Sequence, residues 1–174
     1  KKKVIVSVGR LSPEKGHIIL LRAFGRLEQK DWHLSIIGDG PEMSVLEKEA
    51  IDLGVRDRVQ FHGHIKDFAA IMGESEVFVL PSYHEGFPNA LLEAMSVPVA
   101  CISSDCVAGP GEIINQGVNG LLVKPGDVDE LAAAMELLIN DPVLRENLAT
   151  EAYKVRERFE FEKIAGEYQK FIFK

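Results

Sequence analysis

The sequence lacks the features that mark membrane-spanning, nucleic-acid-binding and disulfide-stabilised proteins. No apolar run approaches the roughly 18–20 residues that a membrane-spanning helix needs. Positive charge is in deficit, with 20 Lys and Arg against 27 Asp and Glu and a net charge of −7. Nucleic acid is therefore not an expected partner, because backbone phosphates require a basic surface. The only two cysteines, Cys101 and Cys106, have no framework of partners and are expected to be reduced thiols of a cytosolic protein.

The chain also has neither an initiating Met nor a signal peptide, since Lys1-Lys2-Lys3 leads directly into an apolar segment. We therefore expect the chain to be a piece of a longer protein. That protein is expected in the cytoplasm, either free or at the cytoplasmic face of the membrane. Its 174 residues, 46% hydrophobic and 27% charged, are enough for one sizeable core. No internal repeat or low-complexity tract is present, so residues 1–174 are interpreted as one domain.

Apolar segments with strand and helix periodicity alternate along the whole chain. Strands are expected at residues 4–8, 32–37, 59–62, 77–80, 98–102 and 120–123, and helices at 17–27, 42–53, 67–72, 90–95, 112–114, 128–139, 142–158 and 161–173. This pattern predicts an α/β fold, a Rossmann-like three-layer sandwich with about six parallel strands.

The most informative stretch, residues 81–95, follows the buried strand 77–80. Gly86 and Pro88 favour a turn, and Asn89 is a good N-cap for a helix. Glu85 and Glu93 would then flank the helix N-terminus, where free N–H groups attract phosphate. Carboxylates repel phosphate but accept hydrogen bonds from hydroxyls. A ligand with hydroxyls on both sides of a diphosphate, that is, a sugar nucleotide, fits this arrangement.

Other unusual residues follow the other expected strands. Ligands of open parallel sheets bind at the carboxyl edge of the strands, so Arg10, Lys15, His64 and residues 103–105 are expected to converge with the two carboxylates. Arg10 and Lys15 lie five residues apart in a strand-to-helix loop and suit a diphosphate. That loop, residues 9–16, lacks both the ending of a P-loop and a Gly-x-Gly-x-x-Gly turn. Taken alone, the loop favours the simpler interpretation of a solvated Arg and Lys.

Several other interpretations remain open. His62 and His64 could ligate a metal, but no third ligand stands nearby, and no metal site is expected. His84, beside Glu85, could act as a general base, but an orienting or merely exposed histidine is favoured. Glu85 and Glu93 could form the acid and base of a glycosidase, although cations nearby would keep both ionised, which favours recognition. Residues 38–41 are most simply a turn before a helix.

Taken together, these motifs resemble one known family. Five motifs occur in a fixed order along the chain. They are Gly9-Arg10-Leu11 with Lys15-Gly16, Gly38-Asp39-Gly40-Pro41, Val59-x-Phe61-x-Gly63, Pro81-Ser82-x-x-Glu85-Gly86-Phe87-Pro88-Asn89-Ala90-Leu91-Leu92-Glu93-Ala94-Met95 and Asn119-Gly120-Leu121-Leu122-Val123. The whole chain is similar to the C-terminal, donor-binding half of the retaining glycosyltransferases of family four, which have the two-domain GT-B architecture. An N-terminal acceptor-binding domain would be absent from this chain.

The resemblance implies a role for each matching position. Arg10 and Lys15 would hold the donor diphosphate, Glu85 the transferred sugar and Glu93 the ribose, with the base near His64-Ile65. Glu85, Arg10 and Lys15 would carry the chemistry. The implied donor-binding set is Gly9, Arg10, Lys15, His64, Ile65, Glu85, Gly86, Phe87, Pro88, Asn89, Leu92 and Glu93. No cofactor and no obligatory metal are implied, since the nucleotide sugar is a substrate.

The sequence departs from the family after Glu93. The family usually has Glu-Ala-Met-Ala-x-Gly-x-Pro-Val, whereas residues 95–99 here are two residues shorter and lack the glycine that ends the helix. Either the turn is rebuilt or residues are missing. Residues 104–114 resemble the loop of enzymes that use UDP-linked hexoses or N-acetylhexosamines, although Glu112 could simply cap its own helix.

The expected function is that of a hexosyl- or N-acetylhexosaminyltransferase donor domain, inactive or nearly so without its acceptor-binding half. Its partners would be a nucleotide sugar, the missing domain and an acceptor glycan, lipid or small molecule that the sequence does not specify. The alternatives are a non-catalytic nucleotide-binding or scaffold domain of the same fold, and a sugar-nucleotide epimerase or phosphorylase of the same architecture.

Overall fold

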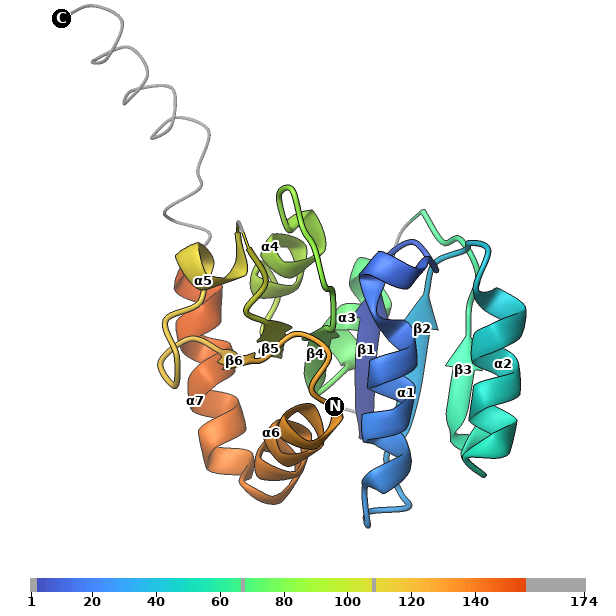
Figure 1. Ribbon diagram of the computed structural model, residues 1–174. Helices are drawn as coiled ribbons and strands as arrows, with labels where there is room; N and C mark the ends of the chain where they lie inside the picture. Colours follow the sequence, from blue (N-terminus) through green and yellow to red (C-terminus); the bar gives the residue numbers. More distant parts are fainter. Residues whose placement is uncertain (1–2, 67, 108, 156–174) are drawn as a thin grey trace, which may run out of the picture.

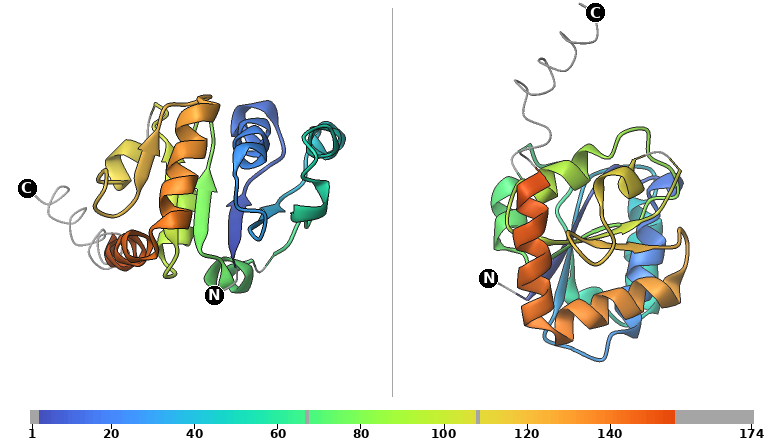
Figure 2. Two further views of the ribbon diagram at one scale, coloured as in Figure 1. Left: turned by 90° about the horizontal axis from the view of Figure 1, so that it is seen from below. Right: turned by 90° about the vertical axis from the view of Figure 1, so that its left-hand side faces the viewer.

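A computed structural model describes residues 3–66, 68–107 and 109–155, which form a six-stranded parallel sheet covered by helices on both faces (Figures 1 and 2). The strands are β1 (Val4–Val8), β2 (His33–Ile37), β3 (Val59–Phe61), β4 (Val77–Leu80), β5 (Ala100–Ser104) and β6 (Leu121–Val123). The helices are α1 (His17–Arg26), α2 (Met43–Asp52), α3 (Ala69–Glu74), α4 (Asn89–Met95), α5 (Pro110–Ile113), α6 (Val128–Asn140) and α7 (Pro142–Tyr153), with short 3-10 turns η1 (Pro13–Lys15) and η2 (Arg56–Arg58). The expectation of an α/β sandwich with six parallel strands is confirmed.

The strand order is β3-β2-β1-β4-β5-β6. Val6 of β1 is in register with Ser35 of β2 on one side and with Phe78 of β4 on the other. The chain therefore adds strands outward from β1 in one direction and then returns to build the other half from β4. Loops that leave the carboxyl ends of β1 and β4 lie side by side at this reversal, which is where open α/β sheets bind ligands.

Alternate residues of the strands supply two hydrophobic cores, as the two-residue period of a strand requires. On β4, Val77 and Val79 belong to the core shared with α1, α2 and α6, while Phe78 and Leu80 belong to the core shared with α3, α4 and α5. Helix α7 contributes to both cores. The helices pack on both faces of the sheet, and the loops lie at the carboxyl edge of its strands.

Several expected boundaries were wrong by a few residues. Pro98 and Val99 precede β5 because the Val99 N–H bonds locally to the Val97 carbonyl, and sheet pairing begins with the Ala100 N–H, which bonds to Glu76. Ser103, expected in a loop, is instead a buried residue of β5, as is Ser104. Helix α3 begins at Ala69 rather than at 67.

The shortened turn after α4 is closed without a glycine. Ser96 follows the helix in a right-handed conformation, and its hydroxyl donates to the Glu93 carbonyl at 2.6 Å. The Val97 N–H bonds to Ala94, which completes the turn. In this chain the helix that carries Glu93 thus ends with a serine side chain bonded to the last turn, where the family usually has a glycine.

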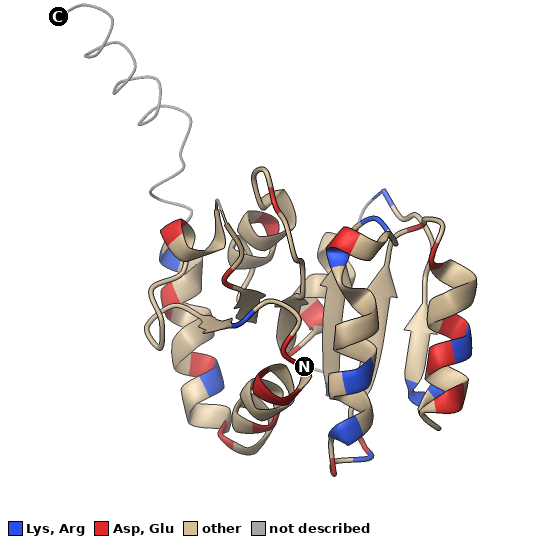
Figure 3. Ribbon diagram, in the orientation of Figure 1, with Lys and Arg blue, Asp and Glu red and all other residues tan. Residues whose placement is uncertain are grey.

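The surface of the described residues carries both signs of charge. Figure 3 shows acidic and basic residues intermingled along α2 and α7. None of the helices described is both long enough and apolar enough to cross a membrane. The expected helix over residues 161–173 lies outside the described residues.

Candidate functional site

Two loops from opposite halves of the sheet lock together at the point where the strand order reverses. The Tyr83 N–H, after β4, donates to the Glu14 carbonyl, after β1, at 2.8 Å. Gly16 has a φ of +67°, and a Cβ at this position would lie 2.2 Å from the Pro81 carbonyl oxygen. Only glycine allows this approach without a shift of the backbone. The two loops are therefore held in a fixed relation to each other.

This packing brings two of the sequence-predicted site residues into direct contact. Lys15 Nζ lies 2.8 Å from Glu85 Oε1, although the residues are 70 positions apart. The Ser82 hydroxyl donates to the same oxygen at 2.6 Å. The side chain of Glu85 is only 6% exposed and that of Lys15 26%. Glu85 is thus a nearly buried carboxylate held by one cation and one hydroxyl.

Arg10 is exposed, and its backbone is held by the neighbouring β2–α2 loop. On either side of it, the N–H groups of Gly9 and Leu11 donate to Ile37 and Asp39 at 3.0 and 2.9 Å. A Cβ on Gly38 would lie 1.9 Å from the Gly9 carbonyl oxygen. A turn before α2 was expected for residues 38–41, and the structure adds a second role for it, the support of the Arg10 loop.

A groove of about 540 Å³ runs along the carboxyl edge beside Arg10. Its lining residues are Val8, Gly9, Arg10, Ile37, Gly38, Asp39, His64, Ile65 and Phe68. Four sequence-predicted positions, Gly9, Arg10, His64 and Ile65, therefore share one hollow. Phe68 adds an apolar wall that the sequence did not indicate.

The remaining predicted residues lie on the loop after β4 and on α4. Glu93 is exposed on the second turn of α4, and Phe87 is 56% exposed. The backbone N–H groups of Gly86 and Phe87 donate to no group in the described part of the chain. Pro88 is buried against Gly109 of the β5–α5 loop, and Leu92 packs partly on the second core.

The expected N-cap at Asn89 was wrong. Asn89 is the first residue of α4, and the cap position belongs to Pro88, whose carbonyl accepts from the N–H groups of Leu91 and Leu92. The Asn89 N–H donates to Phe87 at 2.9 Å. Pro88 occupies the cap because its carbonyl starts the helical hydrogen bonds, so the Asn89 side chain caps nothing.

The sequence interpretation assigned no individual role to three residues at this edge. Besides Ser82, these are His17 and Cys106, both buried. Burial, with a smaller contribution from Lys15, lowers the pKa of His17 to about 4, so its imidazole is neutral. Burial and the nearby charge of Glu85 raise the pKa of the Cys106 thiol. Ser82 could have been found from its position three residues before Glu85, whereas nothing local marks Cys106.

His17 is unusual because neither ring nitrogen has a hydrogen-bond partner. It is the first residue of α1, and a Cβ on Gly9 would lie 3.5 Å from its Cε1 atom. The ring therefore packs beneath the Arg10 and Lys15 loop as a neutral, buried group.

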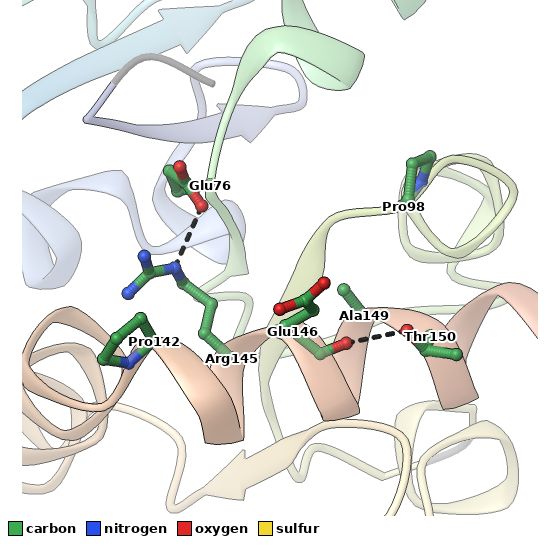
Figure 4. Close-up of a pocket in the computed structure, with 7 residues that line it drawn as sticks. All are labelled: Glu76, Pro98, Pro142, Arg145, Glu146, Ala149 and Thr150. Atoms are coloured by element: carbon green, nitrogen blue, oxygen red, sulfur yellow. Dashed lines mark hydrogen bonds and ion pairs between the residues drawn. The ribbon is translucent and has the colours of Figure 1, made fainter.

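A second pocket, of about 360 Å³, lies at the amino edge of the strands (Figure 4). Two of its polar side chains pair with each other, since Arg145 Nε donates to Glu76 Oε2 at 2.9 Å, and the Thr150 hydroxyl donates to the Glu146 backbone carbonyl. The Arg145 guanidinium also donates to the carbonyls of Leu138 and Ile139 at the end of α6. These contacts join α6 and α7 to the residue that precedes β4. The sequence-predicted site residues lie at the opposite edge of the sheet.

No group of three or more His, Cys, Asp and Glu residues that could hold a metal is found within the described ranges. At the carboxyl edge the structure brings Lys15 and Glu85 into contact and places Arg10 in the groove, whereas Glu93 is exposed on α4 and does not line that groove. The fold defines a Rossmann-like domain, and domains of this kind bind their ligands where the strand order reverses.

Comparison with known proteins places this domain in a family. Residues 1–155 match the family model described as glycosyl transferases group 1, and the chain belongs to that family. It corresponds to the C-terminal half of the GT-B fold. Over 98% of its length it superposes on 48% of HepE from Anabaena, crystallised in complex with UDP, with a TM-score of 0.92 and 26% identity.

Two further relatives define the extent of the match. The C-terminal domain of the group 1 glycosyl transferase LpcC from Francisella tularensis is 28% identical, with a TM-score of 0.79, and the match covers 88% of this chain and 84% of that one. An exopolysaccharide phosphotransferase of Streptomyces coelicolor is 35% identical over 170 residues, 96% of this chain but 18% of that protein. The chain spans less than half the length of the curated relatives it matches.

Proposed function

We propose that this chain is the donor-binding half of a retaining glycosyltransferase that uses a UDP-linked hexose or N-acetylhexosamine. The observation that carries the proposal is the contact of Lys15 with the nearly buried Glu85 where the strand order reverses. The exposed Arg10 lies in the same β1–α1 loop as Lys15. HepE, which shares the fold, has been crystallised with UDP and with UDP-glucose, which supports UDP as the nucleotide.

Each part of the donor has a matching part of the site. Arg10 and Lys15 would bind the diphosphate, since a guanidinium and an ammonium are strong partners of phosphate oxygens. The groove lined by His64, Ile65 and Phe68 would take the base. Glu93 would accept hydrogen bonds from the ribose hydroxyls, and Glu85 from the transferred sugar, with Gly86 and Phe87 N–H groups available to either.

The reaction would break the bond between the sugar and the diphosphate, which leaves negative charge on the departing diphosphate. Arg10 and Lys15 would stabilise that charge as it develops, without an obligatory metal. Glu85 would orient the sugar, since a carboxylate held on one side can accept hydrogen bonds on the other. Retention at the transferred carbon is an expectation that comes from the family.

The whole enzyme would include an N-terminal domain that binds the acceptor and excludes water, so this half alone would transfer little or no sugar. A cytoplasmic location is part of the same proposal. The acceptor would be recognised mainly by that other domain.

Calorimetric titration tests the donor site directly. UDP, GDP, UDP-glucose, UDP-galactose and UDP-N-acetylglucosamine would be titrated into the wild-type chain and into two arginine variants. Arg10→Ala should weaken UDP binding by roughly tenfold or more, the loss of a charge-assisted hydrogen bond. Arg22→Ala is the matched control, because Arg22 pairs with Glu49 on the outer surface of α1 and α2. Equal affinities for the two variants, or no binding of any nucleotide, would refute the proposed site.

Activity of the full-length protein separates an enzyme from a scaffold domain of the same fold. Release of UDP from a UDP-sugar by the two-domain protein, lost in Arg10→Ala, is expected of a transferase. Tight UDP binding without any release in the presence of an acceptor mixture would favour the non-catalytic alternative.

A further inference from the structure

The hydroxyl of Ser82 donates a hydrogen bond to Glu85, and the proposed function assigns it no role. We infer that Ser82 is a positioning residue, which fixes the Glu85 carboxylate so that a single oxygen, Oε2, is presented to the sugar of the donor. The inference rests on the proposed function and adds the means by which the sugar, as distinct from the nucleotide, is recognised.

The geometry of the carboxylate supports this division of labour. Ser82 Oγ and Lys15 Nζ both contact Glu85 Oε1, at 2.6 and 2.8 Å. Within the described residues Oε2 accepts no hydrogen bond. A carboxylate oxygen has two lone pairs, so the two donors occupy Oε1 and leave Oε2 as the free acceptor. A sugar hydroxyl is a donor of the right kind for that oxygen.

Ser82 is itself held more firmly than Lys15. It is fully buried, at 0% exposure, between Pro81, which packs on Gly16, and Tyr83, which bonds to Glu14. The short serine side chain has one rotatable carbon bond, whereas the ammonium of Lys15 sits on a flexible four-carbon stem. The terminal torsion of glutamate is broad, so a carboxylate held only by a lysine would rotate more freely. The fixed hydroxyl therefore sets the direction in which Oε2 points.

The consequence is a separation between the two ends of the donor. Nucleoside and diphosphate would contact Arg10, Lys15, Glu93 and the groove. Of these, only Lys15 shares an oxygen with Ser82, and its own bond to Glu85 Oε1 does not require the serine hydroxyl. Loss of the hydroxyl should weaken binding of the sugar and leave binding of UDP nearly unchanged. A purely structural role of Ser82 in folding would instead lower the affinities for UDP and for the UDP-sugar together.

The test measures dissociation constants for UDP and for the UDP-sugar that the wild-type chain binds most tightly, and compares their ratio among variants. In Ser82→Ala the constant for the UDP-sugar should rise about five- to tenfold, the loss of one hydrogen bond, and that for UDP less than twofold. Ser82→Cys has a side chain of similar size with a weaker hydrogen-bond donor, so its dissociation constant for the UDP-sugar should lie between those of the wild type and Ser82→Ala. If Ser82→Ala fails to fold, Ser82→Cys is the variant whose two dissociation constants are compared with those of the wild type.

A double variant shows whether Ser82 acts through Glu85. Glu85→Gln should raise the same ratio, and adding Ser82→Ala to it should raise the ratio no further, because the group that Ser82 positions is already changed. Independent, multiplicative effects of the two substitutions would overturn the inference, as would a parallel loss of UDP and UDP-sugar in Ser82→Ala. Failure of the wild-type chain to bind UDP would instead overturn the proposed function, and the inference with it.

Discussion

Gly16 approaches Pro81 so closely that a methyl group on Gly16 would overlap the Pro81 carbonyl oxygen, at 2.2 Å. This contact joins the loop that carries Lys15 to the loop that carries Glu85. A single glycine in a left-handed conformation thus decides whether two distant parts of the sequence can form one site.

Gly16→Ala should therefore be strongly destabilising, by about 3 kcal/mol or more, because the conformational penalty is added to a clash with backbone. Gly54→Ala is the matched control. Gly54 has the same φ of +67°, but a Cβ there meets nothing within 4 Å, so only the conformational cost of about 1 kcal/mol is expected. Urea unfolding of both variants measures the difference, and equal losses would show that the contact with Pro81 does not matter.

The contact of Lys15 with Glu85 should appear as a coupling energy. Lys15→Met leaves the nearly buried carboxylate with Ser82 as its sole described hydrogen-bond donor, and we expect a loss of about 1–3 kcal/mol in the free energy of unfolding. Lys15→Met with Glu85→Gln should be less destabilised than the sum of the two single variants. Strict additivity in a double-mutant cycle would mean that the two side chains do not interact in solution.

Glu93 should matter for binding and not for folding, since it is exposed on α4. Glu93→Ala should change the free energy of unfolding by less than about 0.5 kcal/mol and weaken UDP binding by roughly tenfold. It should also abolish the preference for UDP over 2′-deoxy-UDP, because the lost acceptor is the one assigned to the ribose. Glu28→Ala, an exposed carboxylate in the loop after α1, serves as the control. A retained preference in Glu93→Ala would remove Glu93 from the ribose site.

His17 should make the domain sensitive to mild acid. Its pKa is about 4 in the folded protein, below the usual 6.5, because the buried imidazole resists protonation. The unfolded chain then binds the extra proton as the pH falls below 6.5, so stability decreases between pH 6.5 and 4 and is fully present above that range. The loss should reach about 3 kcal/mol.

Urea unfolding at several pH values measures this slope, and His17→Gln should flatten most of it. Partial burial also lowers the pKa of His62, which adds a slope of the same sign. His62→Gln therefore separates the two histidines. A slope that His17→Gln leaves unchanged would show that His17 is not the titrating group.

Much of the fold followed from periodicity, because the strands are mostly apolar segments, as in β4, and α1 has a clear apolar stripe. Boundaries failed where tertiary contacts outweigh local preference. Ser103 looks like a loop residue, yet its hydroxyl bonds to the Ser104 carbonyl and is buried in β5. Asparagine is a favourable N-cap residue, but the first helical hydrogen bonds of α4 are accepted by the carbonyl of Pro88, so Asn89 lies inside the helix.

The candidate site could be proposed from the sequence as a set of residues and not as a set of contacts. Residue types and the order of motifs singled out Arg10, Lys15, Glu85 and Glu93. Their expected convergence on one edge of the sheet could be argued from parallel strands alone. The pairing of Lys15 with Glu85 and the part played by Ser82 depend on how two loops pack, which no local pattern encodes.

The two halves of the sheet meet at β1 and β4, which share only two register pairs, Ile5 with Val77 and Val6 with Phe78. The loops that carry the site cross this seam. A fragment ending before β4 would contain Arg10 and Lys15 but neither Glu85 nor Glu93. A fragment starting at β4 would contain the two glutamates but neither cation. A bound sugar nucleotide would act as a bridge between the halves, so that occupancy of the donor site and cohesion of the sheet rise together by mass action.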